Sequence, residues 1–256
     1  MVFALALALA ATPLRIVGHD APLPSVATST LTVHEPLSGT ERTFYGRAVV
    51  PLLDAALGER WRQSAVVIFH CADGYAARVE VAKLLKYRPV LAERALEDPF
   101  TAKSSDGKLI RLDPYYLVWD NLRHPELRAS GAKGWPYRVR ELEVASAEAH
   151  LEALALGPEA SPAARRGKQA FVKHCVACHA ISGAGGKVGP DLNAPVSVVD
   201  LFRPKWLRTW LLDPQSIRPG TAMPGIPSGA KDRPAIADDL IAYLRARRAA
   251  SSEPTR

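Results

Sequence analysis

Two cysteines and a histidine fall within five residues of this 256-residue chain, in the run Cys175-Val176-Ala177-Cys178-His179. Thiols three positions apart lie on one side of a helical turn, where both can add to the vinyl groups along one porphyrin edge. A histidine directly after the second cysteine then lies beneath the ring, where it can bind the iron. The spacing therefore predicts covalent attachment of one haem c, with His179 as an axial ligand.

Two other uses of a cysteine pair fit the sequence less well. A zinc site of this kind needs a second ligand pair, and the only further cysteine is Cys71. A redox-active dithiol normally follows a strand of a βαβ unit, whereas this pair ends a segment with helical signals. Three cysteines are also too few for a disulfide framework.

A haem that carries electrons needs a second axial ligand, typically the sulfur of a methionine or the nitrogen of a histidine. Apart from Met1 the chain has one methionine, Met223, in the proline-rich run RPGTAMPGIP, 44 residues after His179. His174 is a poor rival because it lies too close to the attachment site to reach the opposite face of the ring. The sequence therefore predicts Met223 as the sixth iron ligand.

Helix signals surround these residues. Ser161 followed by proline is typical of a helix start, and this helix is expected to run to about Cys178. Two more helices are predicted over Pro204–Pro214 and Pro234–Ala250, each with a proline near its start. Residues 161–250 are therefore expected to form an all-α domain.

This region resembles a class I cytochrome c in the motifs GKQAFVKHCVACHAISGAGGKVGPDL, PGTAMPG and LIAYL. The resemblance implies one-electron transfer through a haem ligated by histidine and methionine. It also implies that Gly167 and Phe171 on the first helix pack against the last helix near Tyr243 and Leu244.

Three further residues gain expected roles from the same resemblance. The carbonyl of Pro190 is expected to accept a hydrogen bond from the His179 ring nitrogen that does not bind iron, which orients the imidazole and raises its donor strength. Trp206 or Trp210 is expected to line the haem or to reach a propionate, with plain core packing as the alternative.

The first half of the chain reads as an α+β domain over residues 29–144, mixed β with a few helices. The expected strands are Thr30–Pro36, Ser64–Cys71, Ala77–Val81, Tyr115–Trp119 and Arg138–Val144, and the expected helix is Ala48–Leu57. Residues 145–160 are rich in alanine and glutamate and are predicted to be a linker that contains a connecting helix.

The runs TLTVHEPLSGTERTFYGRAVVPLLDAAL and VVIFHCADGYAARVEV resemble part of the molybdopterin-binding domain of the sulfite oxidase superfamily. The resemblance implies that Cys71 binds molybdenum and that Arg78, Arg138 and Arg140 hold the pterin phosphate. The region is shorter than that family's domain and lacks its arginine-rich segment after the cysteine. A buried thiol is therefore the first interpretation of Cys71, and a molybdopterin ligand is the alternative.

The net charge of +7 is uneven. Residues 161–256 carry 15 Lys and Arg against 7 Asp and Glu, whereas the rest carries 18 against 19. This excess favours a redox protein partner with an acidic docking surface. The basic residues form no run and no nucleic-acid motif occurs, so a nucleic-acid partner is not expected.

The apolar run Val2–Ala11 has the length of a signal-peptide core and is too short to span a membrane. Residues 1–11 are therefore predicted to be a signal-peptide-like segment, and no run elsewhere is long enough for a transmembrane helix. Periplasmic or other export is expected, because haem attachment of this kind occurs outside the cytoplasm.

Together these patterns predict an exported monohaem electron carrier with an N-terminal docking or structural domain, and no catalytic residue is assigned. The alternative is a molybdopterin-dependent dehydrogenase that passes electrons from a centre on Cys71 to the fused haem. A third hypothesis makes the first domain a sensor of a small ligand, coupled to the redox state of the haem.

Overall fold

The computed structural model describes residues 13–97, 99–104, 107–146, 152 and 154–251. The chain divides into two compact units: one combines residues up to 72 with 77–145, and the other combines 73–76 with 146 onward. The predicted signal-peptide-like segment at residues 1–11 lies outside the described residues, as do residues 147–151 and 153 of the predicted connecting helix within 145–160.

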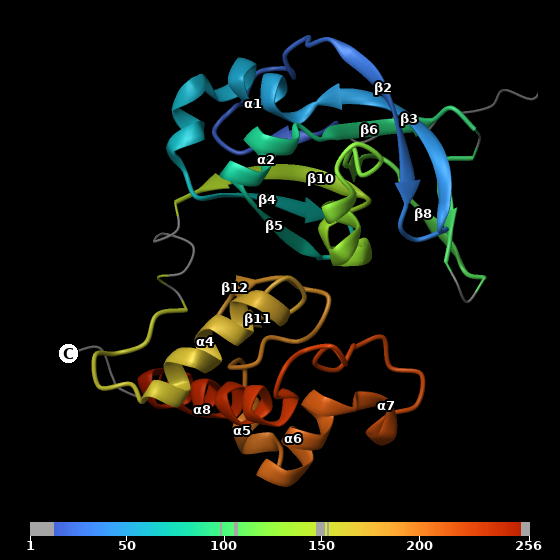
Figure 1. The fold of residues 1–256 in the computed structure, drawn as a ribbon. Coiled ribbons are helices and arrows are strands. Elements are labelled where there is room, and N and C mark those ends of the chain that lie inside the picture. Colours follow the sequence, from blue (N-terminus) through green and yellow to red (C-terminus); the bar gives the residue numbers. More distant parts are fainter. Residues whose placement is uncertain (1–12, 98, 105–106, 147–151, 153, 252–256) are drawn as a thin grey trace, which may run out of the picture. The chain divides into compact units, whose positions relative to one another are not determined.

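The first unit contains two four-stranded sheets within the described residues, with the orders β1-β10-β4-β5 and β2-β3-β6-β9 (Figure 1). The strands of the first sheet, in that order, are Arg15–Ile16, Val139–Ala145, Val66–Cys71 and Ala76–Glu80. The strands of the second are Thr28–Glu35, Thr40–Ala48, Val90–Ala95 and Tyr116–Val118. A hairpin of β7 (Thr101–Lys103) and β8 (Leu109–Arg111) is attached to this unit.

Short helices complete the first unit: α1 (Val49–Leu57), α2 (Val81–Tyr87) and the 3₁₀ segments η1 (Glu59–Gln63) and η2 (Pro125–Gly134). The expected strands and the expected helix are all present, with bounds within two residues of those predicted. The mixed β architecture is therefore confirmed. The parallel pairing of β1 with β10 also brings residues upstream of the expected start at residue 29 into this unit.

Aromatic side chains fill the core of the first unit. The rings of Phe44 and Tyr116 are fully buried and meet edge to face, with centroids 5.5 Å apart. The Tyr116 hydroxyl donates to the buried carboxylate of Glu35 at 2.7 Å. Because a buried carboxylate needs hydrogen-bond donors, the backbone N–H groups of Leu37 and Ser38 also donate to Glu35. These polar groups hold the turn after β2 rather than forming an open site.

Where its residues are described, the second unit is helical apart from one small hairpin. Its helices are α4 (Pro162–His174), α5 (Val198–Leu201), α6 (Pro204–Leu212), α7 (Pro214–Ile217) and α8 (Arg233–Ser251), and its hairpin pairs β11 (Ala180–Ile181) with β12 (Ala184–Gly185). The three long helices confirm the helical prediction for this region. The two short helices and the hairpin were not predicted, because so few residues carry no periodic signal.

Helices α4 and α8 lie side by side and cross at Gly167 (Figure 1). A Cβ atom at Gly167 would collide with the backbone carbonyl of Asp239, so the glycine sets the closeness of this crossing. Nearby, the buried rings of Phe171 and Tyr243 pack with centroids 5.6 Å apart. Leu244 is also buried in this core, so the predicted packing of the first helix on the last is confirmed.

The first helix of this unit is shorter than predicted. The Ser161 hydroxyl accepts a hydrogen bond from the Ala164 N–H at 3.2 Å, so the predicted N-cap is confirmed. The helix ends at His174, however, and not near Cys178. Within the part of the chain that the structure describes, no helix is both long and apolar enough to cross a membrane.

Candidate cofactor site

The Cys-x-x-Cys-His motif forms its own turn directly after α4. The Cys175 N–H donates to the Phe171 carbonyl at 2.8 Å, which ties the turn to the helix. The N–H groups of Cys178 and His179 then both donate to the Cys175 carbonyl, at 3.0 and 2.9 Å. Both cysteines are thiols and partly exposed, so one turn carries two partly exposed cysteines and a histidine.

The imidazole of His179 is oriented by Pro190. Nδ1 of His179 lies 2.8 Å from the Pro190 carbonyl oxygen, which can only accept a hydrogen bond. Nδ1 therefore carries the proton, and Nε2 keeps its lone pair for a metal. The structure thus contains the hydrogen bond that the resemblance implied.

Gly189 is a further site residue, to which the sequence reasoning assigned no role. A Cβ atom at this position would collide with the His179 ring, so the chain passes against the imidazole only because glycine has no side chain. The Gly189 N–H also donates to the Cys178 carbonyl at 2.8 Å. The signal in the sequence that could have revealed this role is the position of the glycine directly before Pro190, to which a role was assigned.

Asp191 fixes the loop that carries Pro190, and it too was assigned no role from the sequence. Its carboxylate accepts hydrogen bonds from the backbone N–H groups of Ser182 at 3.0 Å, Gly183 at 2.6 Å and Asn193 at 2.8 Å. Partial burial raises the pKa of Asp191, but these hydrogen bonds outweigh it and hold the pKa below its ordinary value. The ionised carboxylate therefore clamps the loop to the β11–β12 turn.

Met223 lies on the loop between α7 and α8, partly buried against the core of the second unit. Its sulfur accepts a hydrogen bond from Nε1 of Trp210, 2.9 Å away. The loop is tied to α6 through the Ile226 N–H, which donates to the Leu211 carbonyl at 2.8 Å. The methionine thus has a defined place against the apolar core.

The two tryptophans of α6 have different surroundings. Trp206 is 54% exposed, whereas Trp210 is partly buried and bonds to Met223. Packing thus separates the two tryptophans, with Trp210 partly buried and Trp206 on the surface of the second unit. Neither indole donates to a backbone or carboxylate group among the described contacts.

The residues around Cys71 form a different environment. Cys71 is 8% exposed, and its sulfur lies 3.8 Å from the Phe69 carbonyl. In the sheet register Val139 pairs with Cys71, while Arg138 and Arg140 flank that pairing. Burial of this thiol agrees with its interpretation as a small apolar residue of the core. Among the described residues, no three His, Cys, Asp or Glu side chains are grouped as metal ligands.

Arg78, the third arginine expected to bind phosphate, is partly buried on β5. Its Nη1 atom is buried without a hydrogen-bond partner, and this burial lowers the pKa of the guanidinium, while the charge of Glu143 opposes the shift. Glu143 itself lies 2.8 Å from Nε2 of His70. His70 on β4, Arg78 on β5 and Glu143 on β10 thus form a polar cluster, in which Nη1 of Arg78 donates no hydrogen bond.

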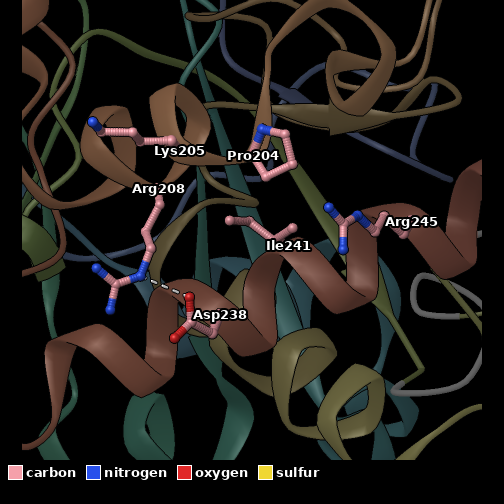
Figure 2. A pocket seen from close by; sticks show the side chains of 6 residues that line it. All are labelled: Pro204, Lys205, Arg208, Asp238, Ile241 and Arg245. Atoms are coloured by element: carbon pink, nitrogen blue, oxygen red, sulfur yellow. Dashed lines mark hydrogen bonds and ion pairs between the residues drawn. The ribbon is translucent and has the colours of Figure 1, made fainter.

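A shallow hollow of about 250 Å³ opens between α6 and α8 (Figure 2). Its lining residues are Pro204, Lys205, Arg208, Asp238, Ile241 and Arg245. Asp238 pairs with Arg208 at 2.8 Å, so the hollow keeps an excess of positive charge around an apolar floor. The motif residues and Met223 do not line it.

Comparisons with known proteins identify the second unit. The sequence model of the cytochrome c family matches residues 164–247. Over 88 residues the chain is 33% identical to a protein of Alkalihalophilus pseudofirmus named cytochrome c oxidase subunit 2; this covers 32% of the chain and 25% of that protein. The chain thus spans about a quarter of the length of this curated relative. Residues 164–247 form a cytochrome c domain, and the match does not extend to the first unit.

Proposed function

We propose that this protein is a one-electron carrier that holds a single haem c, attached through Cys175 and Cys178 and ligated by His179 and Met223. The observation that carries the proposal is the 2.8 Å hydrogen bond from Nδ1 of His179 to Pro190, because it leaves Nε2 able to bind a metal in the residue that follows two partly exposed cysteines. When bound, the haem supplies a one-electron iron couple.

The protein's own residues account for the rest of the proposed chemistry. His179 and Met223 would together hold the iron, and a haem held by two protein ligands would favour electron transfer over turnover of a substrate. The apolar side chains around Met223 would keep water away from the bound group and would favour the reduced, less charged iron. The partly buried side chains that pack against this core, as Met223 does, include Leu192, Val198, Val199 and Leu212.

The proposed partner is a redox protein with an acidic docking surface. The excess of eight positive charges in residues 161–256 supports this, since a basic surface steers an acidic partner during diffusion. The cationic rim of the hollow in Figure 2 adds local positive charge next to an apolar floor. Export to the periplasm belongs to the same proposal, because covalent haem attachment takes place outside the cytoplasm.

For the first unit we propose a docking or structural role. The burial of Cys71 and its pairing with Val139 support a thiol that fills the core. The alternative, a molybdopterin-dependent dehydrogenase, draws on one observation: Arg78 has a buried nitrogen without a hydrogen-bond partner, and arginine is well suited to bind phosphate. This alternative specifically predicts that a pterin phosphate accepts a hydrogen bond from that nitrogen.

Elemental analysis tests both functions on protein purified from a host that makes haem c and molybdopterin. We expect one iron and no molybdenum per chain, and mass spectrometry should show one haem bound covalently. Replacing Cys175 and Cys178 by alanine should abolish the attachment, whereas Cys71→Ala should not alter it. One molybdenum per chain, lost in Cys71→Ala, would instead establish the dehydrogenase.

A further inference from the structure

Strand β2 lies at one end of its sheet, whose order among the described strands is β2-β3-β6-β9 (Figure 1). It pairs residue for residue with β3, from Thr28 opposite Arg47 to Glu35 opposite Thr40. In an antiparallel pair, the N–H and carbonyl groups of alternate residues point toward the partner strand, and those of the residues between them point away. One set of backbone groups on β2 therefore points outward from the sheet.

His34 belongs to this outward set. Its N–H donates to Oδ1 of Asn121 at 2.9 Å, and its carbonyl accepts from Nδ2 of Asn121 at 2.7 Å. The buried side chain of Asn121 thus takes the place that a neighbouring strand would have. It covers the edge of β2 at His34, and the alternation places Thr32, Thr30 and Thr28 in the same outward set.

The partner strand gives the same assignment independently. Thr43 lies opposite Thr32 on β3. The Thr43 N–H donates to the Glu97 carboxylate at 3.2 Å, and the Thr43 carbonyl accepts from the Leu96 N–H at 2.9 Å. Because both groups of Thr43 point away from β2, Thr32 and Thr43 exchange no backbone hydrogen bonds. The N–H and carbonyl of Thr32 therefore lie on the open edge of β2.

The open edge spans Thr28–Thr32 and lacks the usual protection of an edge strand. Natural edges carry charged side chains, prolines or bulges, which prevent pairing with another chain. This run, TSTLT, contains no charge and no proline, and its register with β3 has no bulge. Thr28, Thr30 and Thr32 are exposed, and no described residue bonds to their outward backbone groups. The edge can therefore accept a further strand.

We propose that this edge pairs with the same edge of a second copy of the chain, antiparallel about a two-fold axis at Thr30. Thr28 of each copy then lies opposite Thr32 of the other, and the two Thr30 residues lie opposite each other. All of these residues belong to the outward set, so each opposed pair exchanges two N–H···O bonds. The pairing leaves the ladder between β2 and β3 unchanged.

The chemistry of the edge favours a second copy over an unrelated strand. Self-pairing brings no like charges together, because the run is uncharged, and threonines placed opposite each other are a favourable pair across two strands. Residues 1–160 carry 18 Lys and Arg against 19 Asp and Glu, so the net charge of this part of the chain does not oppose association. On the core face, the partly buried Leu31 next to the fully buried Val33 would be covered further by the added strand.

Sedimentation equilibrium of the full-length, haem-loaded protein tests the proposal. We expect a reversible equilibrium between monomer and dimer that shifts with protein concentration. Thr30→Lys and Thr30→Glu each place two like charges opposite each other, which should raise the dissociation constant of the dimer about fivefold. An equimolar mixture of the two variants should associate at least as well as the parent, since lysine then lies opposite glutamate. Thr40→Lys, exposed beside the turn of the β2–β3 hairpin, is the matched control and should associate as the parent does.

Three outcomes of these measurements would contradict the proposal. A parent protein that stays monomeric at millimolar concentration overturns it. A dimer whose dissociation constant is unchanged in Thr30→Lys overturns it as well, because the contact then lies elsewhere. A mixture of Thr30→Lys and Thr30→Glu that associates as weakly as either variant alone excludes the two-fold register, because Thr30 then does not face itself.

Hydrogen exchange of the unaltered protein gives a second measurement, which does not depend on the folding of a variant. The amides of Thr30 and Thr32 should exchange rapidly in dilute solution and about tenfold more slowly once the protein is dimeric. The amides of Leu31 and Val33 bond to β3 and should be protected at both concentrations. Equal exchange of the Thr30 amide at low and high concentration overturns the inference. Protection that requires another protein, and not a higher concentration, would assign the edge to a different strand and would overturn it too.

Discussion

His179 is held by two neighbours of different kinds. Pro190 accepts a hydrogen bond from Nδ1, and Gly189 lets the backbone pass against the ring. The first contact selects the tautomer that leaves Nε2 to bind a metal, and the second limits the rotation of the ring. The local backbone by itself thus holds the imidazole of the histidine in one orientation.

Gly189→Ala should displace the His179 ring, because the added Cβ atom would occupy the space of the imidazole. We expect a lower yield of covalently attached haem, and a ferric spectrum that indicates weaker histidine ligation in the molecules that carry haem. Gly229→Ala is the control, since a Cβ atom there meets no other atom within 4 Å. Equal amounts of attached haem and equal spectra for both variants would show that the loop accommodates the added Cβ atom and that Gly189 has no role.

Asp191 should make the stability of the second unit depend on pH. Its pKa is lowered below the ordinary value of 3.8 because the folded state stabilises the carboxylate. The stabilisation is therefore complete above pH of about 3.8 and is lost as the pH falls below that value toward the folded pKa. Asp191→Asn should lower the free energy of unfolding by about 2 kcal/mol at neutral pH and remove this dependence.

Denaturant titrations at neutral pH and near pH 3 measure this effect. The exposed Glu159, changed to glutamine, serves as the control for loss of a carboxylate in the same unit. If the free energies of unfolding of Asp191→Asn and the parent differ by the same amount at both pH values, the proposed clamp is contradicted.

At the scale of elements, the crossing of α4 and α8 carries the site. The motif turn begins at the end of α4, and the Cys175 N–H is bonded to Phe171 in that helix. Phe171 in turn packs on Tyr243 of α8. A displacement of the crossing is therefore passed directly to the cysteines and the histidine.

Gly167→Ala should force α4 and α8 apart, because the Cβ atom would collide with the Asp239 carbonyl. We expect a loss of about 2 kcal/mol in the free energy of unfolding, the usual range for overpacking a tight contact. Gly157→Ala, at a position with no atom within 4 Å, is the control. Thermal and denaturant unfolding of the haem-loaded proteins provide the measurement, and equal stabilities would show that the crossing relaxes at no cost.

At the scale of the whole molecule, the two parts of the sequence differ in net charge. The excess of eight positive charges belongs to residues 161–256, and the remainder carries one net negative charge. A one-electron reagent that reacts at the second unit should therefore respond to the local charge of that unit as well as to the net charge of +7.

Small redox reagents of opposite charge test this expectation. Oxidation of the reduced protein by anionic hexacyanoferrate should slow as ionic strength rises, because salt screens the attraction over a Debye length of about 10 Å at 0.1 M. Oxidation by a cationic cobalt complex should become faster under the same change. The same sign of salt dependence for both reagents would exclude steering by the basic surface.

Local sequence alone determined much of the local structure of this protein. The Cys-x-x-Cys-His turn, the N-cap at Ser161, the single methionine beyond Met1, five strands and one helix of the first unit and the three long helices of the second unit follow from spacing, turn residues and periodicity. The pairing of Pro190 with His179 followed from a resemblance, since residues 11 positions apart on a loop show no local signal of contact.

Only the tertiary structure decided the contacts between residues distant in sequence. Trp206 and Trp210 are the same residue type on one helix, so the sequence does not distinguish them. Only packing places Trp206 at the surface and Trp210 against the Met223 sulfur. The burial of Cys71 likewise depends on its sheet partner Val139, 68 residues away. The reason is physical: periodicity reports which face of an element is apolar, but the atom that a side chain meets depends on how separate elements pack.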